Sequence, residues 1–135
     1  GQYYVAVRHR NHLGVMTANA VMVAANTGVL DFTSQATATY GTQPQALLNY
    51  GRMGLWGGNA VADKTIKYTG AANDRDAILS RIGGTEPTAT VPGYYSEDVN
   101  MDGTVKYTGA NNDRDAIVVT LGGLSPNAVR NEQLP

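Results

Sequence analysis

The chain has 135 residues and a net charge of −1, which is enough for one ordinary domain or two very small ones. The near-neutral charge gives no electrostatic reason to expect nucleic-acid or anionic-membrane binding, and no apolar run approaches the ~20 residues of a membrane-spanning helix. Cysteine is absent and phenylalanine occurs once, which excludes disulfides and thiolate zinc sites and predicts short strands, turns and small helices around a thin core.

The N-terminal part, residues 1–35, predicts an antiparallel β meander. Side chains alternate in character from Gln2 to Arg10 with the two-residue period of a strand. Three short strands leave two unpaired edges and an uncovered apolar face, so we expect the meander to belong to an Ig-like sandwich that is completed elsewhere, for example by another chain. The other expected elements are a turn at Asn11–Gly14, a strand at Ala20–Ala25, a turn at Asn26–Gly28 and a strand at Gly28–Phe32.

Residues 36–53 are rich in Thr, Ala, Gln and Gly and predict an exposed linker, with one helical turn at Ala46–Tyr50. The next part of the chain, 54–123, carries one unit twice, at 54–84 and 93–123. Asp63 to Ile78 matches Asp102 to Ile117 at thirteen of sixteen positions. Trp56 and Tyr95 occupy equivalent places before the two loops, where we expect them to pack in a shared core.

Each unit is expected to run loop, strand, loop, helix, which makes the fold class mixed but mainly β. The predicted strands are Thr65–Tyr68 and Thr104–Tyr107. The helices are expected to begin at Asn73–Asp74 and Asn112–Asp113, where Asn or Asp can cap, and to end at the Gly-Gly pairs 83–84 and 122–123. Residues 124–135 are expected to form an extended tail.

The stretch that begins at Asp98 has the order of a calcium loop. Side-chain oxygens fall at the first, third and fifth positions (Asp98, Asn100, Asp102), a glycine follows, and Thr104 offers a backbone carbonyl. A further carboxylate is expected from the helix start, with Asp113 the first choice and Asp115 the second. The alternative is a polar turn held by side-chain-to-backbone hydrogen bonds.

The first unit is a weaker candidate for the same ion. Its equivalent positions are Asn59, Asp63 and Thr65, with Asp74 or Asp76 returning from the helix. The third ligand position is Val61, which has no side-chain oxygen, and Lys64 replaces the glycine. We therefore expect one Ca2+ in the second unit, and a first site that is either looser or lost. Because ligand carboxylates repel each other without a cation, Ca2+ is expected to contribute to folding.

The duplicated segment D-x-N-x-D-G-x-V with its following helix resembles the dockerin-type calcium repeat. The fuller text, GQYYVAVRHRNHLGV followed by IKYTG and VKYTG units with NDRD, is similar to the C-terminal region of large secreted and surface proteins of Bacteroidota. The resemblance implies an extracellular or cell-surface location and a leading strand from the late part of a β-sandwich. The chain departs from dockerins by an insertion between Val105 and Asp113, so a cohesin-type partner does not follow.

The rest of the sequence offers little for zinc binding or catalysis. His9 and His12 would face opposite sides of a continuous strand, and no third ligand is near in sequence, which disfavours zinc. Neither a hydrolase elbow, a phosphate loop nor a dinucleotide fingerprint occurs, and the acids gather in the two loops, so we expect no catalytic activity.

Three functions remain open. The first is a non-catalytic, calcium-stabilised structural module that self-associates as the subunit of a surface fibre or pilus-like assembly. The second is a dockerin-like module that anchors to another secreted or surface protein. The third is carbohydrate binding, for which the candidate aromatic residues are Tyr3, Tyr4, Tyr94 and Tyr95, although core packing is expected for most of them.

Overall fold

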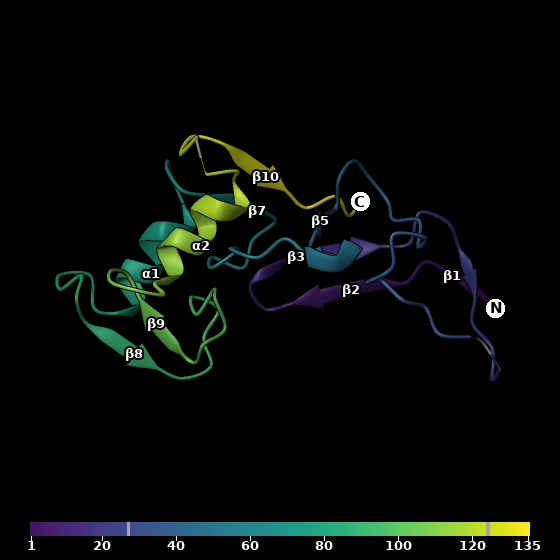
Figure 1. Ribbon diagram of the computed structural model, residues 1–135, viewed down its shortest axis with the longest axis horizontal. Coiled ribbons are helices and arrows are strands. Elements are labelled where there is room, and N and C mark those ends of the chain that lie inside the picture. The colour runs from purple at the N-terminus through teal and green to yellow at the C-terminus, as the bar shows by residue number, and fades with distance from the viewer. Residues whose placement is uncertain (27, 124) are drawn as a thin grey trace.

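The computed structural model describes residues 1–26, 28–123 and 125–135. Over these residues the chain forms five antiparallel sheets of two strands each and two short α-helices, which confirms the expected mixed, mainly β class. The helices lie together at one end of the molecule, and β1 with the N-terminus lies at the other (Figure 1). Thr27, within the turn expected at Asn26–Gly28, and Leu124, the first residue of the expected tail, lie outside the described residues.

Two small sheets form the N-terminal part. β2 (Ala6–His9) and β3 (His12–Met16) make a hairpin, with His9 opposite His12 and a register shift between Val7 and His9. β1 (Gln2–Tyr3) pairs with β4 (Val21–Met22). The chain therefore forms strands in both regions where alternation and β-branched residues predicted them, although each strand is short.

The turn expected at Asn11–Gly14 is wrong, because the chain reverses at Arg10 and Asn11 and is already extended at His12. Gly14, which suggested the turn, lies inside β3. A Cβ at this position would come within 2.8 Å of Leu134 Cδ1, so the glycine gives room to the C-terminal segment that packs against the strand.

The third strand of the expected meander, Gly28–Phe32, does not form either. Asp31 Oδ1 instead accepts hydrogen bonds from Thr33 N at 2.8 Å and from Thr33 Oγ1 at 2.7 Å. Such a local side-chain-to-backbone bond competes with an extended ladder. Val29 is 97% exposed, so no burial offsets the preference for the turn.

The segment expected as a linker contains a further hairpin. β5 (Gln45–Leu47) pairs with β6 (Met53–Leu55), and a 3₁₀ turn at Asn49–Gly51 lies between them. Ala46–Tyr50 is therefore not a helical turn as expected: it spans part of β5 and the start of this 3₁₀ turn. Gln45 is buried, and its Nε2 donates to Phe32 O at 2.9 Å, which ties the hairpin to the N-terminal part.

The duplicated units have the expected order and exchange strands. β7 (Thr65–Lys67) precedes α1 (Asp74–Arg81), and β9 (Thr104–Lys106) precedes α2 (Asp113–Thr120). The strand after α1, β8 (Thr90–Pro92), pairs with β9, and the strand after α2, β10 (Val129–Asn131), pairs back with β7. This exchange joins the two units into one body with an approximate twofold relation.

Both helices begin and end as the sequence predicts. The side chains of Asn73 and Asn112 cap the helices by accepting hydrogen bonds from the third residue beyond each, at 2.8 and 2.9 Å. The glycine pairs that follow both helices have positive φ, the left-handed conformation in which glycine is favoured as a helix stop.

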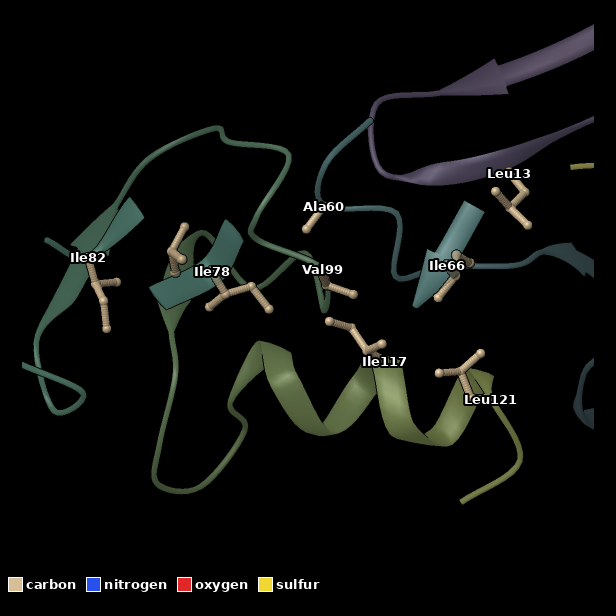
Figure 2. Close-up of a cluster of buried hydrophobic side chains, with 9 residues drawn as sticks. Leu13, Ala60, Ile66, Ile78, Ile82, Val99, Ile117 and Leu121 are labelled. Atoms are coloured by element: carbon tan, nitrogen blue, oxygen red, sulfur yellow. The ribbon is translucent and has the colours of Figure 1, made fainter. Parts of the chain in front are cut away.

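The core lies between the two units and is nearly symmetric (Figure 2). Ile66, Val105, Ile78 and Ile117 are fully buried, and Trp56 and Tyr95 pack against the cluster as expected. Full burial of each such aliphatic side chain contributes about 1.5–3 kcal/mol. The cluster consists of Leu13 and four pairs of equivalent residues: Ala60 with Val99, Ile66 with Val105, Ile78 with Ile117, and Ile82 with Leu121.

The tip of the β2–β3 hairpin docks between the two loops of the duplicated units. Asn11 is 0% exposed, and its backbone oxygen accepts from Gly58 N at 3.1 Å and Asn59 N at 3.0 Å. Its side-chain Nδ2 donates to Asp98 O at 2.6 Å. Leu13, from the same hairpin, enters the core, so the N-terminal part and the duplicated part share one interior.

The C-terminal segment returns to the same hairpin. The Glu132 side chain is 2% exposed and accepts from Arg8 Nη1 at 3.0 Å and from Gly14 N at 2.8 Å. Glu132 N donates to Lys64 O at 2.8 Å. The segment beyond β10 therefore packs along the body of the molecule.

Candidate metal centre

In the second loop, side-chain oxygens converge on the backbone of residues 102 to 104. Asp102 N donates to Asp98 Oδ1 at 3.1 Å and to Asn100 Oδ1 at 2.9 Å, so these two oxygens lie on the same side of the turn. Asp102 Oδ1 accepts from Thr104 N at 3.0 Å. Gly103 has φ +88°, which is the sharp bend expected at the sixth position of a calcium loop.

The two carboxylates expected from the helix differ in where they point. Asp113 is fully buried and reaches the loop: its Oδ1 accepts from Val99 N at 2.7 Å and from Asn100 N at 3.1 Å. Asp115 turns away, accepting from Asn112 Nδ2 at 2.8 Å. The structure therefore brings Asp113 to the loop and leaves Asp115 on the helix surface.

The loop carries several negative charges, and a cation that no motif in the sequence predicts, Arg10, lies beside it. Burial raises the pKa of Asp113, which the backbone N–H donors oppose, and the negative charge of Asp98 raises it further. Arg10 Nη2 lies 3.4 Å from Asp98 Oδ2, because the hairpin tip docks here. A single guanidinium thus faces a pair of mutually repelling carboxylates, the situation that a bound divalent cation relieves.

The first loop has the same hydrogen bonds with fewer oxygens. Asp63 N donates to Asn59 Oδ1 at 3.1 Å, and Thr65 N donates to Asp63 Oδ1 at 2.6 Å. Asn59 Nδ2 also donates to Asp63 O at 2.7 Å, which closes the turn on itself. Lys64, at the position of the bend, is not among the residues of positive φ.

Asp74 is the buried carboxylate of the first unit, equivalent to Asp113. It accepts from Val61 N at 3.0 Å and from Lys67 N at 2.7 Å, and so joins the loop, the strand β7 and the helix α1. Burial raises its pKa to about 6, although these backbone donors act in the opposite direction. The carboxylate therefore has a structural role that needs no metal.

The donor chemistry of the second loop fits Ca2+, and that of the first does not. Asp98, Asn100, Asp102 and Asp113 supply carboxylate and amide oxygens from one turn and the facing helix. Asp98 Oδ1 and Asp102 Oδ1 each accept one hydrogen bond and so keep a second lone pair, whereas Asp113 Oδ1 already accepts two. The first loop has an amide in place of Asp98, and Val61 and Lys64 add an apolar side chain and a positive charge. Within the described ranges, which include this loop, no three His, Cys, Asp or Glu side chains lie close enough together to share an ion, so Ca2+ binding would require Asp98, Asp102 and Asp113 to move closer together.

The two histidines lie together, which contradicts the expectation that they face opposite sides. His9 and His12 are opposite each other across the β2–β3 hairpin, and their ring centroids are 4.8 Å apart. The chain reverses between them, so the alternation of a single strand does not apply. Burial, the largest cause, and the positive charges of His9 and Arg10 together lower the pKa of His12 to about 4.

The aromatic residues considered for sugar binding are mostly exposed, not buried as expected. Tyr3, Tyr4 and Tyr94 are 58%, 60% and 78% exposed, and Tyr95 is half-buried. In the duplicated part, arginines cover the rings: Arg10 lies 3.7 Å from the centroid of Tyr94 and Arg130 lies 3.5 Å from that of Trp56. These cation–π contacts occupy a ring face that a sugar platform would leave open.

Comparisons with known proteins return no match: no family model, no curated protein and no solved structure matches this chain. Among the residues that the structure describes, no helix is long and apolar enough to cross a membrane.

Proposed function

We propose that this chain is a non-catalytic, extracellular structural module that binds one Ca2+ in its second loop. The observation that carries the proposal is the convergence of Asp98 and Asn100 on the amide of Asp102, with the buried carboxylate of Asp113 behind them. Asp98, Asn100, Asp102 and Asp113 would hold the ion, with the carbonyl of Thr104 as a further donor. The ion supplies the positive charge that draws these oxygens together.

The finer description of the fold belongs to the same proposal. The duplicated loop, strand and helix are dockerin-like, and the hairpin β2–β3 belongs with a sheet of sandwich type. The equivalent hydrogen bonds of the two loops and the equivalent caps of the two helices support the first statement. The small size of the N-terminal sheets supports the second, since two-stranded sheets are marginal alone.

A matched pair of variants tests the ion site. Asp102→Asn removes a ligand charge in the second loop, and Asp63→Asn makes the same change at the equivalent place in the first. By calorimetric titration we expect the wild type to bind one Ca2+ with a Kd of about 10⁻⁴–10⁻³ M, the range of extracellular modules. Asp102→Asn should weaken binding at least tenfold and Asp63→Asn should leave it unchanged. Equal effects of the two variants, or no binding by the wild type, would contradict the proposal.

We further propose that copies of this module associate through the β1–β4 end. β1 lies at the end of the molecule opposite the helices (Figure 1) and offers a strand edge to another chain. In and next to the β1–β4 pair, Tyr3, Tyr4 and Val23 are 58%, 60% and 45% exposed. Sedimentation velocity over a hundredfold range of concentration checks this. We expect larger species at high concentration, lost in Tyr3→Ser/Tyr4→Ser; a wild type that stays monomeric throughout excludes self-association.

A further inference from the structure

The β2–β3 hairpin carries a cluster of three donor atoms that the calcium loop does not use. His9 Nδ1 lies 2.9 Å from His12 Nδ1, and both nitrogens lie close to Asn11 Oδ1, at 3.1 and 2.8 Å. The three atoms thus form a nearly equilateral triangle. It arises because His9 and His12 are cross-strand partners and Asn11 lies in the turn between them.

Other contacts fix the orientation of this triangle. Asn11 Nδ2 donates to Asp98 O at 2.6 Å, which leaves the amide oxygen facing the two imidazoles. The backbone oxygen of Asn11 is held by Gly58 N and Asn59 N, and the residue is fully buried. Metal ligands in proteins are commonly oriented by a hydrogen bond to another residue, because that bond sets the direction of the ligand's lone pair.

Hydrogen bonding alone satisfies this triangle poorly. A neutral imidazole carries one proton on one of its two nitrogens, and the amide oxygen carries none. If neither Nδ1 is protonated, lone pairs of His9, His12 and Asn11 converge at about 3 Å. If both are protonated, two N–H groups meet at the short nitrogen–nitrogen distance of 2.9 Å. If only one is protonated, its N–H donates to the amide oxygen or to the other imidazole, and the lone pairs of the remaining two atoms still meet at 2.8 or 3.1 Å. A cation placed among the three atoms satisfies all of them at once.

The dimensions of the triangle select the class of ion. With metal–donor distances of about 2.0–2.1 Å, donors 2.9 Å apart subtend about 90° at the metal, whereas a tetrahedral ion separates its donors by about 3.4 Å. Right angles between nitrogen and oxygen donors are typical of Cu2+ and Ni2+. Two imidazoles also exclude Ca2+, which takes oxygen ligands.

The surroundings leave the site accessible and its charge balanced. A cleft of about 280 Å³ is lined by both histidines together with Val7, Leu55 and Met101, so solvent reaches the two residues. The two neighbouring arginines are both paired with carboxylates: Arg8 with Glu132 at 3.0 Å and Arg10 with Asp98 at 3.4 Å.

We propose that His9, Asn11 and His12 form a binding site for a divalent late transition ion, with Cu2+ bound more tightly than Ni2+ or Zn2+. This site is separate from the proposed calcium loop and uses no residue whose side chain would hold Ca2+. The order of affinities follows the general preference of nitrogen-containing sites for Cu2+ over its neighbours.

Cu2+ titration of the full chain in excess Ca2+, followed by electron paramagnetic resonance, tests the proposal. The chain has two histidines and no cysteine, so splitting from two imidazole nitrogens on one Cu2+ can come only from His9 and His12. His9→Gln and His12→Gln should each remove one nitrogen from the spectrum. Each should also weaken Cu2+ binding, measured by competition with a chelator. Loss of a residue that only orients a ligand typically weakens metal binding ~10–100-fold, so loss of a ligand should weaken it at least ~10-fold.

Two controls keep the result unambiguous. The N-terminal amine, a second place where Cu2+ can bind, is present in both histidine variants, so its contribution does not change. Asp102→Asn should retain the two-nitrogen spectrum although it loses Ca2+, which separates this site from the calcium proposal. A wild-type spectrum with one imidazole nitrogen or none, or variants that bind Cu2+ as tightly as the wild type, would overturn the proposal, and the wild-type spectrum decides even if a variant does not fold.

Discussion

Two buried carboxylates, Asp74 and Asp113, make equivalent backbone hydrogen bonds at the starts of the two helices. Each accepts backbone hydrogen bonds from the loop before it and from the neighbouring strand. In both, burial outweighs these donors and raises the pKa, so the surroundings disfavour the charged form of each carboxylate. The sequence indicates both residues only as candidate metal ligands; their structural role could not be predicted from it, because that role depends on burial between the two units.

The raised pKa of Asp74 makes the stability depend on pH. A carboxyl whose pKa is about 6 in the folded chain and near 4 when unfolded binds its proton more tightly in the folded state. Its stabilising contribution is complete below about pH 4 and is lost as the pH rises to about 6. In chelator, we expect the urea midpoint of the wild type to fall across this window, and that of Asp74→Asn to fall less. Parallel profiles for the two proteins would contradict this assignment.

At the scale of the elements, local signals were predicted well and long-range pairings were missed. The helices, their Asn caps, their glycine stops and strands β7 and β9 follow from residues that lie within a few positions of one another. β8 ends in Pro92, a residue that argues against a strand, and it forms because Val91 lies opposite Val105. β10 is a short polar segment whose partner, β7, is distant in sequence.

The N-terminal errors have the same cause. Gly14 suggested a turn, yet its value is the space it leaves for Leu134, a contact with the far end of the chain. The reversal at Arg10 and Asn11 places His9 and His12 together, and Asn11 in this turn donates a hydrogen bond to Asp98, which is far along the chain. Interactions across most of the chain length decide these features, and a local pattern does not contain them.

The second loop contains a bend that the first lacks, and the bend can be tested on stability. Gly103 has φ +88°, and an added Cβ would meet no atom within 4 Å, so the effect of Gly103→Ala is confined to the backbone. We expect a loss of about 1–2 kcal/mol in the free energy of unfolding, measured with urea in chelator. Lys64→Ala, at the equivalent position without positive φ, should change it by less than about 0.5 kcal/mol. Equal losses in the two variants would show that the left-handed bend is not the cause.

At the scale of the whole molecule, the hairpin tip, the exchanged strands and the C-terminal segment hold one interior together. Leu13 from β3 enters the core that the two units share, and Glu132 beyond β10 returns to the hairpin (Figure 1). Because β10, which follows the second unit, pairs with β7 of the first, the two units pack against each other and do not form separate successive domains. Mixed, mainly β composition was predictable; this mutual closure was not.

A substitution of Glu132 tests whether the C-terminal segment holds the β2–β3 hairpin in place. Glu132→Ala leaves Gly14 N without its acceptor and removes the partner of Arg8, so we expect a loss of about 1–3 kcal/mol in the free energy of unfolding by urea. Glu86→Ala is the control, because Glu86 is exposed and its substitution should cost less than about 0.5 kcal/mol. A Glu132→Ala variant as stable as the control would mean that the C-terminal segment does not hold the hairpin.

Thermal unfolding of the wild-type chain in 10 mM Ca2+ and in chelator tests the calcium proposal most directly. An ion bound only by the folded state with a Kd of about 10⁻⁴–10⁻³ M stabilises it at this concentration by about 1.4–2.7 kcal/mol. For a chain of this size we expect the Tm to rise by about 5–10 °C. The same rise should occur in Asp63→Asn and fall to about half or less in Asp102→Asn, in which Ca2+ binds at least tenfold more weakly. A wild-type Tm that is the same with Ca2+ and with chelator would contradict the proposal that an ion in the second loop stabilises this fold.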